Sequence, residues 1–568
     1  MMRNTLVGTL FLLFTIGGCS GTQKAGMSSP EKVSTDTQTL LGYQDEIDIG
    51  YLKPHLSAFS ADSMEGRETG MKGQKKAADY LVTQYKKMGL KPIVEEDSYL
   101  QKFKVNATRD DSIVFTITAK DINGTTPADR SVIRENSTAN FIPQFSRGDT
   151  LDGEIVFVGY GVSNKLDINQ LQGQDLQDKW VLAFNNAPQV IDGDTLYKDH
   201  QEFYRAWMTG LLQQGVKGVL TIPEITPEEF YTKAEEQNVA FGKPTGMKLA
   251  YLDEGQEPQG PSLGINTIAP QTAAELLDLE NLAELNNKRE DIARNMDKFN
   301  AQKTGYELSQ ISYNTDVKLG SENVMAFLEG GDPELKDEVV VISSHYDHLG
   351  IGKPDSTGDN IYNGADDDGS GVIGTLNIAK SFAEAAEDGV RPRRSILFLN
   401  VSGEEKGLLG SRFYSDHPVI PIEKTITNIN VDMIGRLDPA HEEKGVEDYS
   451  YIIGSKLISS ELDSLLHVAN ERSGKIELSE KYNDLNDPNQ FYRRSDHWNF
   501  GRLGIPFIFF FTGVHEDYHQ PSDEVDKIHF QKMQKIVRTM YATVVMVANA
   551  DESPKVDNQE FIEITKEG

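Results

Sequence analysis

The stretch that decides the fold is VVVISSHYDHLG, residues 339–350. It opens with four apolar, mostly β-branched residues, which predict a strand buried on both faces of a parallel sheet. The strand then runs into polar residues, among them His345 and Asp347. Proteins of the α/β class bind ligands at this place, beyond the carboxyl ends of their strands. A single histidine after a strand is more often an ordinary loop residue, so the assignment of a site depends on the rest of the chain.

Length, charge and cysteine content limit the possible functions. A chain of 568 residues is expected to form more than one domain. The formal net charge of −32 argues against nucleic acid and against anionic lipid headgroups as partners. The single cysteine, Cys19, excludes an intramolecular disulfide and a cysteine-based zinc site. Any metal must therefore be held by His, Asp and Glu.

The N-terminus has the features of an export signal. Within residues 1–18 a positive residue precedes a short apolar run that is too short to span a bilayer stably. The run ends in two glycines and Cys19, which is similar to a bacterial lipoprotein signal. This resemblance implies an exported protein, anchored by lipid at Cys19 to the periplasmic or cell-surface face of a bacterial membrane; a plain secretory signal is the alternative. Residues 19–44 are polar and predict a flexible tether.

Strands and helices alternate in the C-terminal half of the chain. This alternation predicts an α/β three-layer sandwich with a mixed, largely parallel sheet. The helix predicted over 74–88 carries an amphipathic stripe and joins the same domain. The expected strands are Val324–Leu328, Val339–Ser343, Ile396–Val401, Ile429–Asp432 and Ile505–Phe511, and the expected helices are Ser370–Ala386, Gly407–Tyr414, Leu462–Arg472 and Phe530–Ala550.

A segment of different texture interrupts this domain. Residues 126–314 are rich in glycine and contain short β-like runs, such as WVLAF at 180–184, but no cluster of His, Asp and Glu. We therefore expect a discontinuous domain over 45–125 and 315–550, a β-rich α/β insertion without its own chemistry over 126–314, and an acidic tail over 551–568.

Five acidic or imidazole positions follow strands or lie in the loops beside them. Adjacent acids at a strand end, as in Glu404 and Glu405, point in different directions and can play different roles. Buried carboxylates in such a cluster need cations. Two histidines with about three carboxylates suit two borderline divalent ions, of which zinc is the best candidate. The positions are His345, the loop GADDDGSG at 364–371, Glu404–Glu405, Asp432 and His519.

These motifs together resemble the M28 family of dizinc aminopeptidases. The resemblance covers roughly 45–125 and 315–550, and the insertion is similar to the protease-associated (PA) domain that family members often carry. The motifs are HYDH at 345–348, GADDDGSG at 364–371, SGEEKGLLGS at 402–411, NVDMIG at 430–435, SDHWNFGRLGIP at 495–506, YHQPSD at 518–523 and, in the N-terminal region, SMEGRETG at 63–70.

The resemblance also implies a role for each site residue. Asp367 would bridge two zinc ions; His345 and Asp432 would complete one site, and Glu405 and His519 the other. Glu404 would be the general base. Asp347 would orient His345 from the second shell, and Tyr518 is a candidate for contacting the oxyanion or the substrate.

The leading hypothesis is a zinc-dependent aminopeptidase that releases N-terminal residues from peptides with a water activated by two metals. The alternatives are a carboxypeptidase, for which Arg436, Arg493 and Arg494 could hold a substrate carboxylate, and a glutaminyl cyclase with one zinc. The alternative from another class is a non-catalytic lipoprotein that binds peptides. The sequence carries no signal for an oligomeric state.

Overall fold

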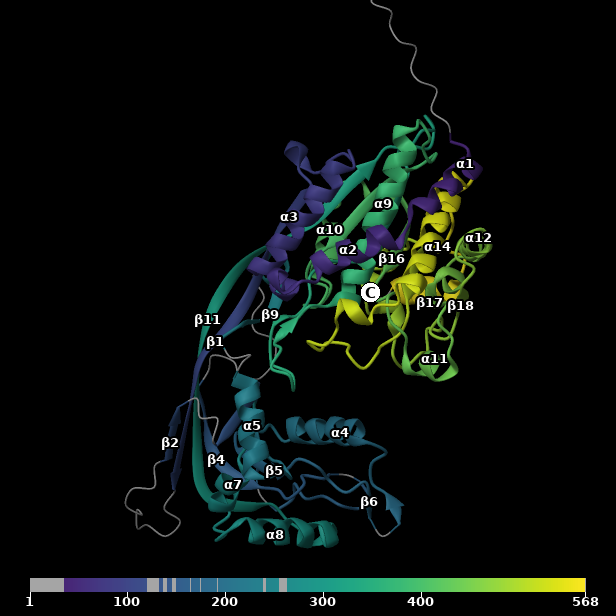
Figure 1. Ribbon diagram of the computed structural model, residues 1–568. Helices are drawn as coiled ribbons and strands as arrows, with labels where there is room; N and C mark the ends of the chain where they lie inside the picture. Colours follow the sequence, from purple (N-terminus) through teal and green to yellow (C-terminus); the bar gives the residue numbers. More distant parts are fainter. Residues whose placement is uncertain are drawn as a thin grey trace, which may run out of the picture.

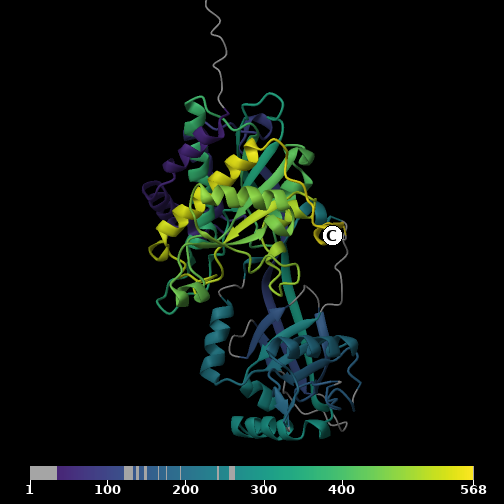
Figure 2. The same cartoon turned by 90° about the vertical axis from the view of Figure 1, so that its right-hand side faces the viewer.

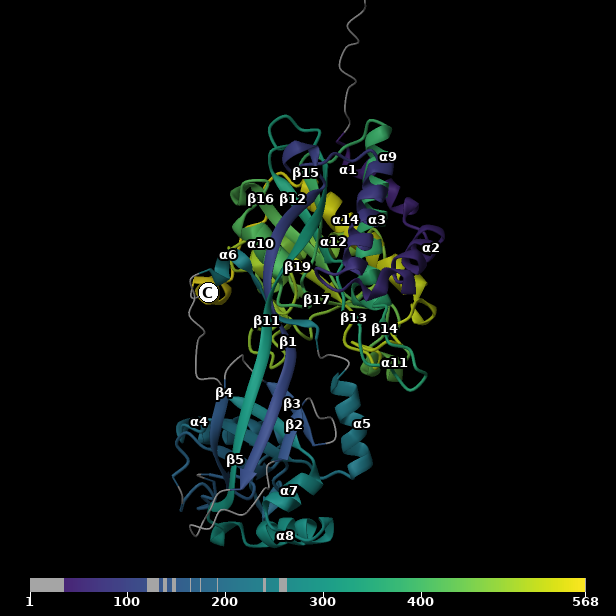
Figure 3. The same ribbon diagram turned by 90° about the vertical axis from the view of Figure 1, so that its left-hand side faces the viewer.

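The computed structural model describes residues 35–566 except 120–131, 136–139, 146–149, 164, 174, 192, 239–241 and 255–262. Figure 1 shows two lobes joined by the long strands β1 (Leu100–Ala119) and β11 (Gln302–Leu328), and the views in Figures 2 and 3 agree. The signal and lipidation predictions for residues 1–18 and Cys19 lie outside the described residues. Within the described part of the chain, no helix has the length and apolar character needed to cross a bilayer.

The larger lobe contains the predicted three-layer sandwich. Its sheet has the order β18-β17-β19-β16-β12-β15-β11. β12 pairs in parallel with both β15 and β16, and β16 pairs in parallel with β19, whereas β11 and β17 join antiparallel to their neighbours β15 and β19. The bounds are β12 (Val339–His345), β15 (Ser395–Val401), β16 (Thr425–Val431), β17 (Tyr449–Gly454), β18 (Glu477–Ser479) and β19 (Phe507–Phe511).

Both faces of this sheet are covered. In β12 all seven residues are buried; Val340 and Ile342 enter one apolar cluster, whereas Val339 and Val341 enter another. This alternation explains why the sequence shows an unbroken apolar run. The first cluster is covered by α2 (Ile49–Phe59), α3 (Lys72–Lys87), α9 (Gly371–Glu387), α12 (Ser460–Glu471) and α14 (Phe530–Asn549), and the second by α10 (Leu409–Asp416) and α13 (Trp498–Gly501).

The two ends of the described chain pack more closely than the sequence suggests. The predicted tether 19–44 contains α1 (Thr37–Gly42), in which Leu40 and Leu41 are buried in the first core. The acidic tail contains α15 (Gln559–Lys566), whose Phe561 is fully buried. The helices α1 and α15 are only six and eight residues long, which is too short for a clear periodic signal. The remaining helix of this lobe is α11 (Pro439–Lys444), and its short hairpin is β13 (Gly350–Ile351) with β14 (Ile361–Tyr362).

The smaller lobe has an apolar core of its own. Its strands β4, β5, β8 and β10 are parallel, and β3 closes the edge antiparallel to β10. The strands are β2 (Val132–Glu135), β3 (Phe141–Phe145), β4 (Thr150–Phe157), β5 (Trp180–Phe184), β6 (Val190–Ile191), β7 (Asp194–Thr195), β8 (Gly218–Ile222) and β10 (Gly264–Ile268), and the helices are α4 (His200–Gln213), α5 (Pro227–Asn238), α7 (Pro270–Leu276) and α8 (Leu282–Arg294). Two elements of the insertion, β9 (Pro244–Leu249) and α6 (Ala250–Asp253), instead pack against α10 of the larger lobe, where Tyr251 donates a hydrogen bond to Asp416.

The ribbon of β1 and β11 runs through both lobes. The two strands pair antiparallel from Leu100↔Val324 to Ala119↔Tyr306, with one irregularity between Asp110 and Ser112. Near one end β11 pairs with β15 of the larger lobe, and near the other with β4 of the smaller lobe. The expected junction at 315 therefore lies inside a continuous strand. The polar run SYNTDVK at 312–318 hides this continuity in the sequence.

Candidate metal centre

The predicted site residues gather at the carboxyl edge of the parallel strands. His345 is the last residue of β12, Asp432 follows β16, and Glu404 and Glu405 lie three and four residues beyond the end of β15. Asp367 lies in the turn Ala365–Ser370 before α9, and His519 lies in the loop after β19. The topology therefore brings together residues that are up to 174 positions apart in the chain.

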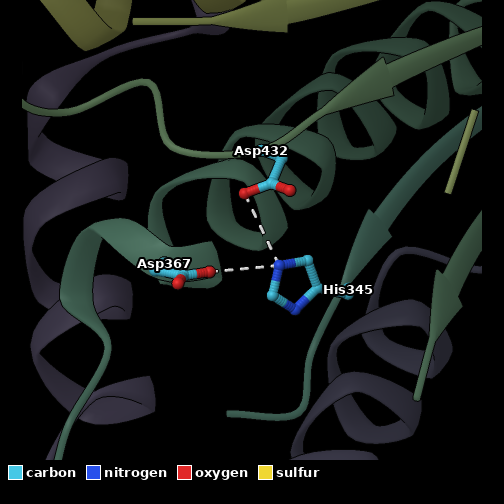
Figure 4. A group of neighbouring side chains, drawn as sticks. All are labelled: His345, Asp367 and Asp432. Atoms are coloured by element: carbon cyan, nitrogen blue, oxygen red, sulfur yellow. Dashed lines mark ion pairs between the residues drawn. The ribbon is translucent and has the colours of Figure 1, made fainter. Parts of the chain in front are cut away.

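His345, Asp367 and Asp432 form the first group (Figure 4). The Nε2 atom of His345 lies 3.1 Å from Oδ1 of Asp367 and 3.5 Å from Oδ1 of Asp432. Nε2 of His345 and Oδ1 of Asp432 are buried and have no hydrogen-bond partner in the structure. Buried polar atoms are normally satisfied, so a convergent imidazole and carboxylate of this kind suit a cation.

Asp367 also faces a second group through its other oxygen. Nε2 of His519 lies 3.2 Å from Oδ2 of Asp367 and 3.2 Å from Oε2 of Glu405. The two oxygens of one buried carboxylate thus point to two different histidine–carboxylate groups. This is the arrangement expected of a carboxylate that bridges two metal ions.

His348 is a member of the second group that the sequence did not identify. It lies in the loop after β12, and its side chain is fully buried. Its Nδ1 lies 2.8 Å from Oε1 of Glu405 and 3.8 Å from Oδ2 of Asp367. Its proximity to His345 in the HYDH motif is the one signal that could have pointed to it.

Asp347 supports the cluster by a different contact from the one expected. Nδ1 of His345 lies 3.1 Å from the main-chain carbonyl oxygen of Asp347, whereas the nearest carboxylate oxygen is 3.9 Å away. The Asp347 carboxylate accepts hydrogen bonds from the Thr69 hydroxyl (2.6 Å) and the Glu404 main-chain N–H (3.3 Å). Asp347 therefore connects His345 with the loop that follows β15.

The other two aspartates of GADDDGSG shape the loops, as the sequence indicated. The Asp368 carboxylate accepts hydrogen bonds from the main-chain N–H groups of His345, Gly371 and Met433 at 3.0–3.2 Å. Asp366 accepts one from the N–H of Gly435 at 2.6 Å. These contacts orient the loops that carry His345, Asp367 and Asp432.

The adjacent glutamates differ in their electrostatic surroundings. Burial raises the pKa of the Glu404 carboxyl well above its usual value; nearby His345 opposes this rise, while Glu405 and Asp432 add to it. Burial would also raise the pKa of Glu405. The imidazoles of His348 and His519 overcome this effect and lower the pKa of Glu405 to about 2. Glu404 is thus suited to hold and release a proton, and Glu405 to remain an anionic ligand.

A cavity opens beside the cluster. Asp367, Glu404 and Asp432 line one part of it, and the ring of Tyr518 stacks on His519 with 3.8 Å between ring centroids. The remaining lining residues are mostly apolar and include one arginine; they are Met433, Phe491, Arg494, Ser495, Phe509, Phe511 and Val514.

The donor set fits zinc or a similar divalent ion. It offers imidazole nitrogens and carboxylate oxygens, both ordinary zinc ligands. Ser495 donates a hydrogen bond of 2.9 Å to Oδ2 of Asp432, so the candidate ligand is held from outside the cluster as well. The structure therefore places the five predicted ligands together and adds His348 beside them.

Comparisons with known proteins point to the same region. The profile of peptidase family M28 matches residues 323–544. The chain is 31% identical over 198 residues to a probable leucine aminopeptidase 2 of Aspergillus oryzae (34% of each chain). It is 26% identical over 225 residues to the aminopeptidase YwaD of Bacillus subtilis (38% of this chain, 43% of the relative). The aligned segments thus span less than half the length of either relative.

A solved aminopeptidase from Aneurinibacillus sp. strain AM-1 has a similar fold. It aligns with a TM-score of 0.52 at 18% identity and covers 91% of this chain and 97% of its own. The profile match includes Asp367, Glu404 and Glu405 and every other predicted metal ligand. Residues 323–544 of this chain therefore match peptidase family M28.

Proposed function

We propose that this protein is a zinc-dependent aminopeptidase that removes N-terminal residues from peptides. The observation that carries the proposal is the two-sided environment of Asp367, whose oxygens face His345 and Asp432 on one side and His519 and Glu405 on the other. The family match and the relatives named as aminopeptidases support it.

The residues of the site can be assigned to steps of peptide hydrolysis. When bound, two zinc ions supply the Lewis acidity that makes water nucleophilic near neutral pH. Glu404 accepts the proton of the attacking water and delivers it to the leaving amine, which suits a carboxyl with a raised pKa. Tyr518 lies against His519 and lines the same cavity, where its hydroxyl can contact the substrate carbonyl oxygen.

The cavity supports the choice of an exopeptidase. Its carboxylates supply negative charge for a free α-amine, and its apolar lining, which includes Phe491 and Phe509, suits a large apolar side chain. We expect activity to depend on a free N-terminus.

Two further assignments belong to this proposal. The insertion over 126–314 is proposed to be a PA domain that governs access, and Cys19 to be the lipid anchor of an exported protein. The apolar core and largely parallel strands of the smaller lobe support an independently folded insertion.

A panel of amino-acid arylamides and matched N-acetylated peptides tests the function, with zinc content measured on the same preparation. The proposal expects hydrolysis of free arylamides with large apolar residues, no hydrolysis of the acetylated compounds, and two zinc ions per chain. Equal cleavage of blocked and free substrates would contradict it.

One observation favours a second candidate, a carboxypeptidase. Arg494 lines the same cavity as Glu404 and Asp432, and its guanidinium forms no ion pair with a carboxylate of the described residues. A guanidinium in this position could hold a substrate carboxylate. Peptides blocked at the N-terminus but free at the C-terminus distinguish the candidates, because only a carboxypeptidase cleaves them.

A further inference from the structure

A short N-terminal segment, residues 65–69, packs directly against the loops of the metal centre. Glu65, Gly66 and Arg67 all have left-handed backbone angles, with φ between +51° and +60°. A Cβ atom on Gly66 would lie 2.4 Å from the carbonyl oxygen of Gly350 and 2.6 Å from that of Tyr362. Only glycine permits this approach, and it brings the next residue, Arg67, into the interior.

The Arg67 guanidinium connects two of these loops. It is fully buried, and it donates to the carbonyl oxygens of Tyr346 (3.0 Å), Asn363 (2.6 Å) and Gly364 (2.9 Å), with a weaker contact to Phe59 (3.3 Å). Tyr346 directly follows His345, and Gly364 lies three residues before Asp367. One planar, rigid group therefore spans the loop of a candidate ligand and the loop of the candidate bridging carboxylate.

The second feature of Arg67 is its buried positive charge. Its guanidinium forms no ion pair within the described chain, although a buried cation without counter-charge is costly. Burial lowers its pKa to about 10, and the carboxylates that oppose this fall are Asp367, Asp523 and Asp347.

The residues that follow Arg67 contact the other loops of the candidate metal centre. Thr69 donates to the Asp347 carboxylate at 2.6 Å, and Glu68 pairs with Lys406, the residue after Glu405, at 3.2 Å. The main-chain carbonyl of Arg67 accepts a hydrogen bond of 3.2 Å from the N–H of His348. Residues 67–69 therefore contact the loops that carry both candidate metal groups.

We propose that Arg67 is a positioning residue of the metal centre: its guanidinium fixes the separation between the loops of His345 and Asp367. It does not touch the cavity, so its effect on catalysis is indirect. This inference rests on the proposed function, because it uses the ligands assigned there.

The test compares Arg67→Lys, which keeps the charge but loses the planar fork, with Arg67→Met, which loses both. Arg394→Met is the matched control. Arg394 is also buried, and it donates a hydrogen bond of 2.7 Å to Glu338. It precedes β15, however, and so lies at the opposite edge of the sheet from the metal centre. The measurements are the zinc dissociation constants by chelator competition, the melting temperature without metal, and kcat and KM at saturating zinc.

We expect Arg67→Lys to weaken the binding of at least one zinc ion by about 10- to 100-fold, the usual cost of losing an outer-shell partner, and to recover most of its kcat at saturating zinc. Arg67→Met is expected to bind more weakly still. Arg394→Met is expected to lower the melting temperature and leave zinc affinity unchanged. If Arg67→Met does not fold, Arg67→Lys decides the question by itself.

The inference is overturned if Arg67→Lys binds zinc as tightly as the wild type, or if Arg394→Met weakens zinc binding equally at an equal loss of melting temperature. Both results leave the proposed function intact. A wild-type protein that binds no zinc would instead overturn the proposed function, so the two failures are distinguishable.

Discussion

The strongest test of the site exchanges each of two neighbouring carboxylates for an amide. Glu404 and Glu405 follow the same strand, yet only Glu405 belongs to a group that could hold a metal ion. Glu404→Gln keeps the shape of the side chain and leaves intact the main-chain hydrogen bond from Glu404 to Asp347. It removes only the ability to accept a proton.

The expected effect of each substitution follows from the surroundings of the two carboxyl groups. General base catalysis contributes about 10²- to 10⁴-fold, so Glu404→Gln is expected to lower kcat about 10³-fold, equivalent to about 4 kcal/mol in the barrier. The low pKa of Glu405 reflects a favourable interaction of its carboxylate with the imidazoles of His348 and His519. Glu405→Gln loses this interaction, and we expect it to lose zinc.

The assay measures zinc content after dialysis and kcat with an apolar arylamide for both variants. Glu404→Gln should retain the wild-type zinc content with little turnover, and Glu405→Gln should be deficient in zinc. If Glu404→Gln lost its zinc while Glu405→Gln kept it, the two assignments would be reversed. Wild-type turnover by Glu404→Gln would remove it from the mechanism altogether.

Three further predictions concern other parts of the chain. Cys19→Ser should release the protein from membranes or block its maturation; a variant that fractionates and matures like the wild type would argue against the lipid anchor. Replacing 126–314 with a Gly/Ser linker should preserve zinc and arylamide cleavage but weaken selectivity for peptide length, and a folded deletion with unchanged selectivity would contradict a role in access. Burial lowers the pKa of Lys532 to about 7 from 10.5. Because the unfolded chain then binds the extra proton, stability should rise between about pH 7 and pH 10, and denaturant unfolding of Lys532→Met should lack this part of the rise.

Much of the candidate site could be predicted because its residues occupy ends of strands. Each of His345, Glu405 and Asp432 follows an apolar run that is buried on both faces, and parallel strands bring their carboxyl ends to one edge. The local sequence therefore identifies residues that meet in space although they lie far apart in the chain. His519 and Asp367 lie in loops; the residue pattern marked His519 and the three consecutive aspartates, and only the family resemblance selected Asp367 among them.

His348 and Arg67 could not be predicted in the same way. Neither belongs to a periodic pattern, and an arginine is seldom fully buried. Arg67 is buried because three left-handed residues turn it inward against carbonyl groups almost 300 positions away in the chain. A contact of this kind depends on loop geometry, which propensity and periodicity do not encode.

The insertion contacts segments that lie beside the candidate metal centre. Lys243, just before β9, donates to the carbonyl oxygen of Ile351 and lies 3.8 Å from Glu68, and Glu236 of α5 pairs with Lys353 at 2.9 Å. Ile351 and Lys353 belong to the loop that connects His345 with Asp367, and Glu68 follows Arg67. The insertion therefore rests on the segments that hold the candidate metal loops, as well as being joined through β1 and β11. Because these contacts are between partly exposed charges, each is weak alone. These contacts place the insertion against the loop between His345 and Asp367, although it adds no residue to the lining of the cavity.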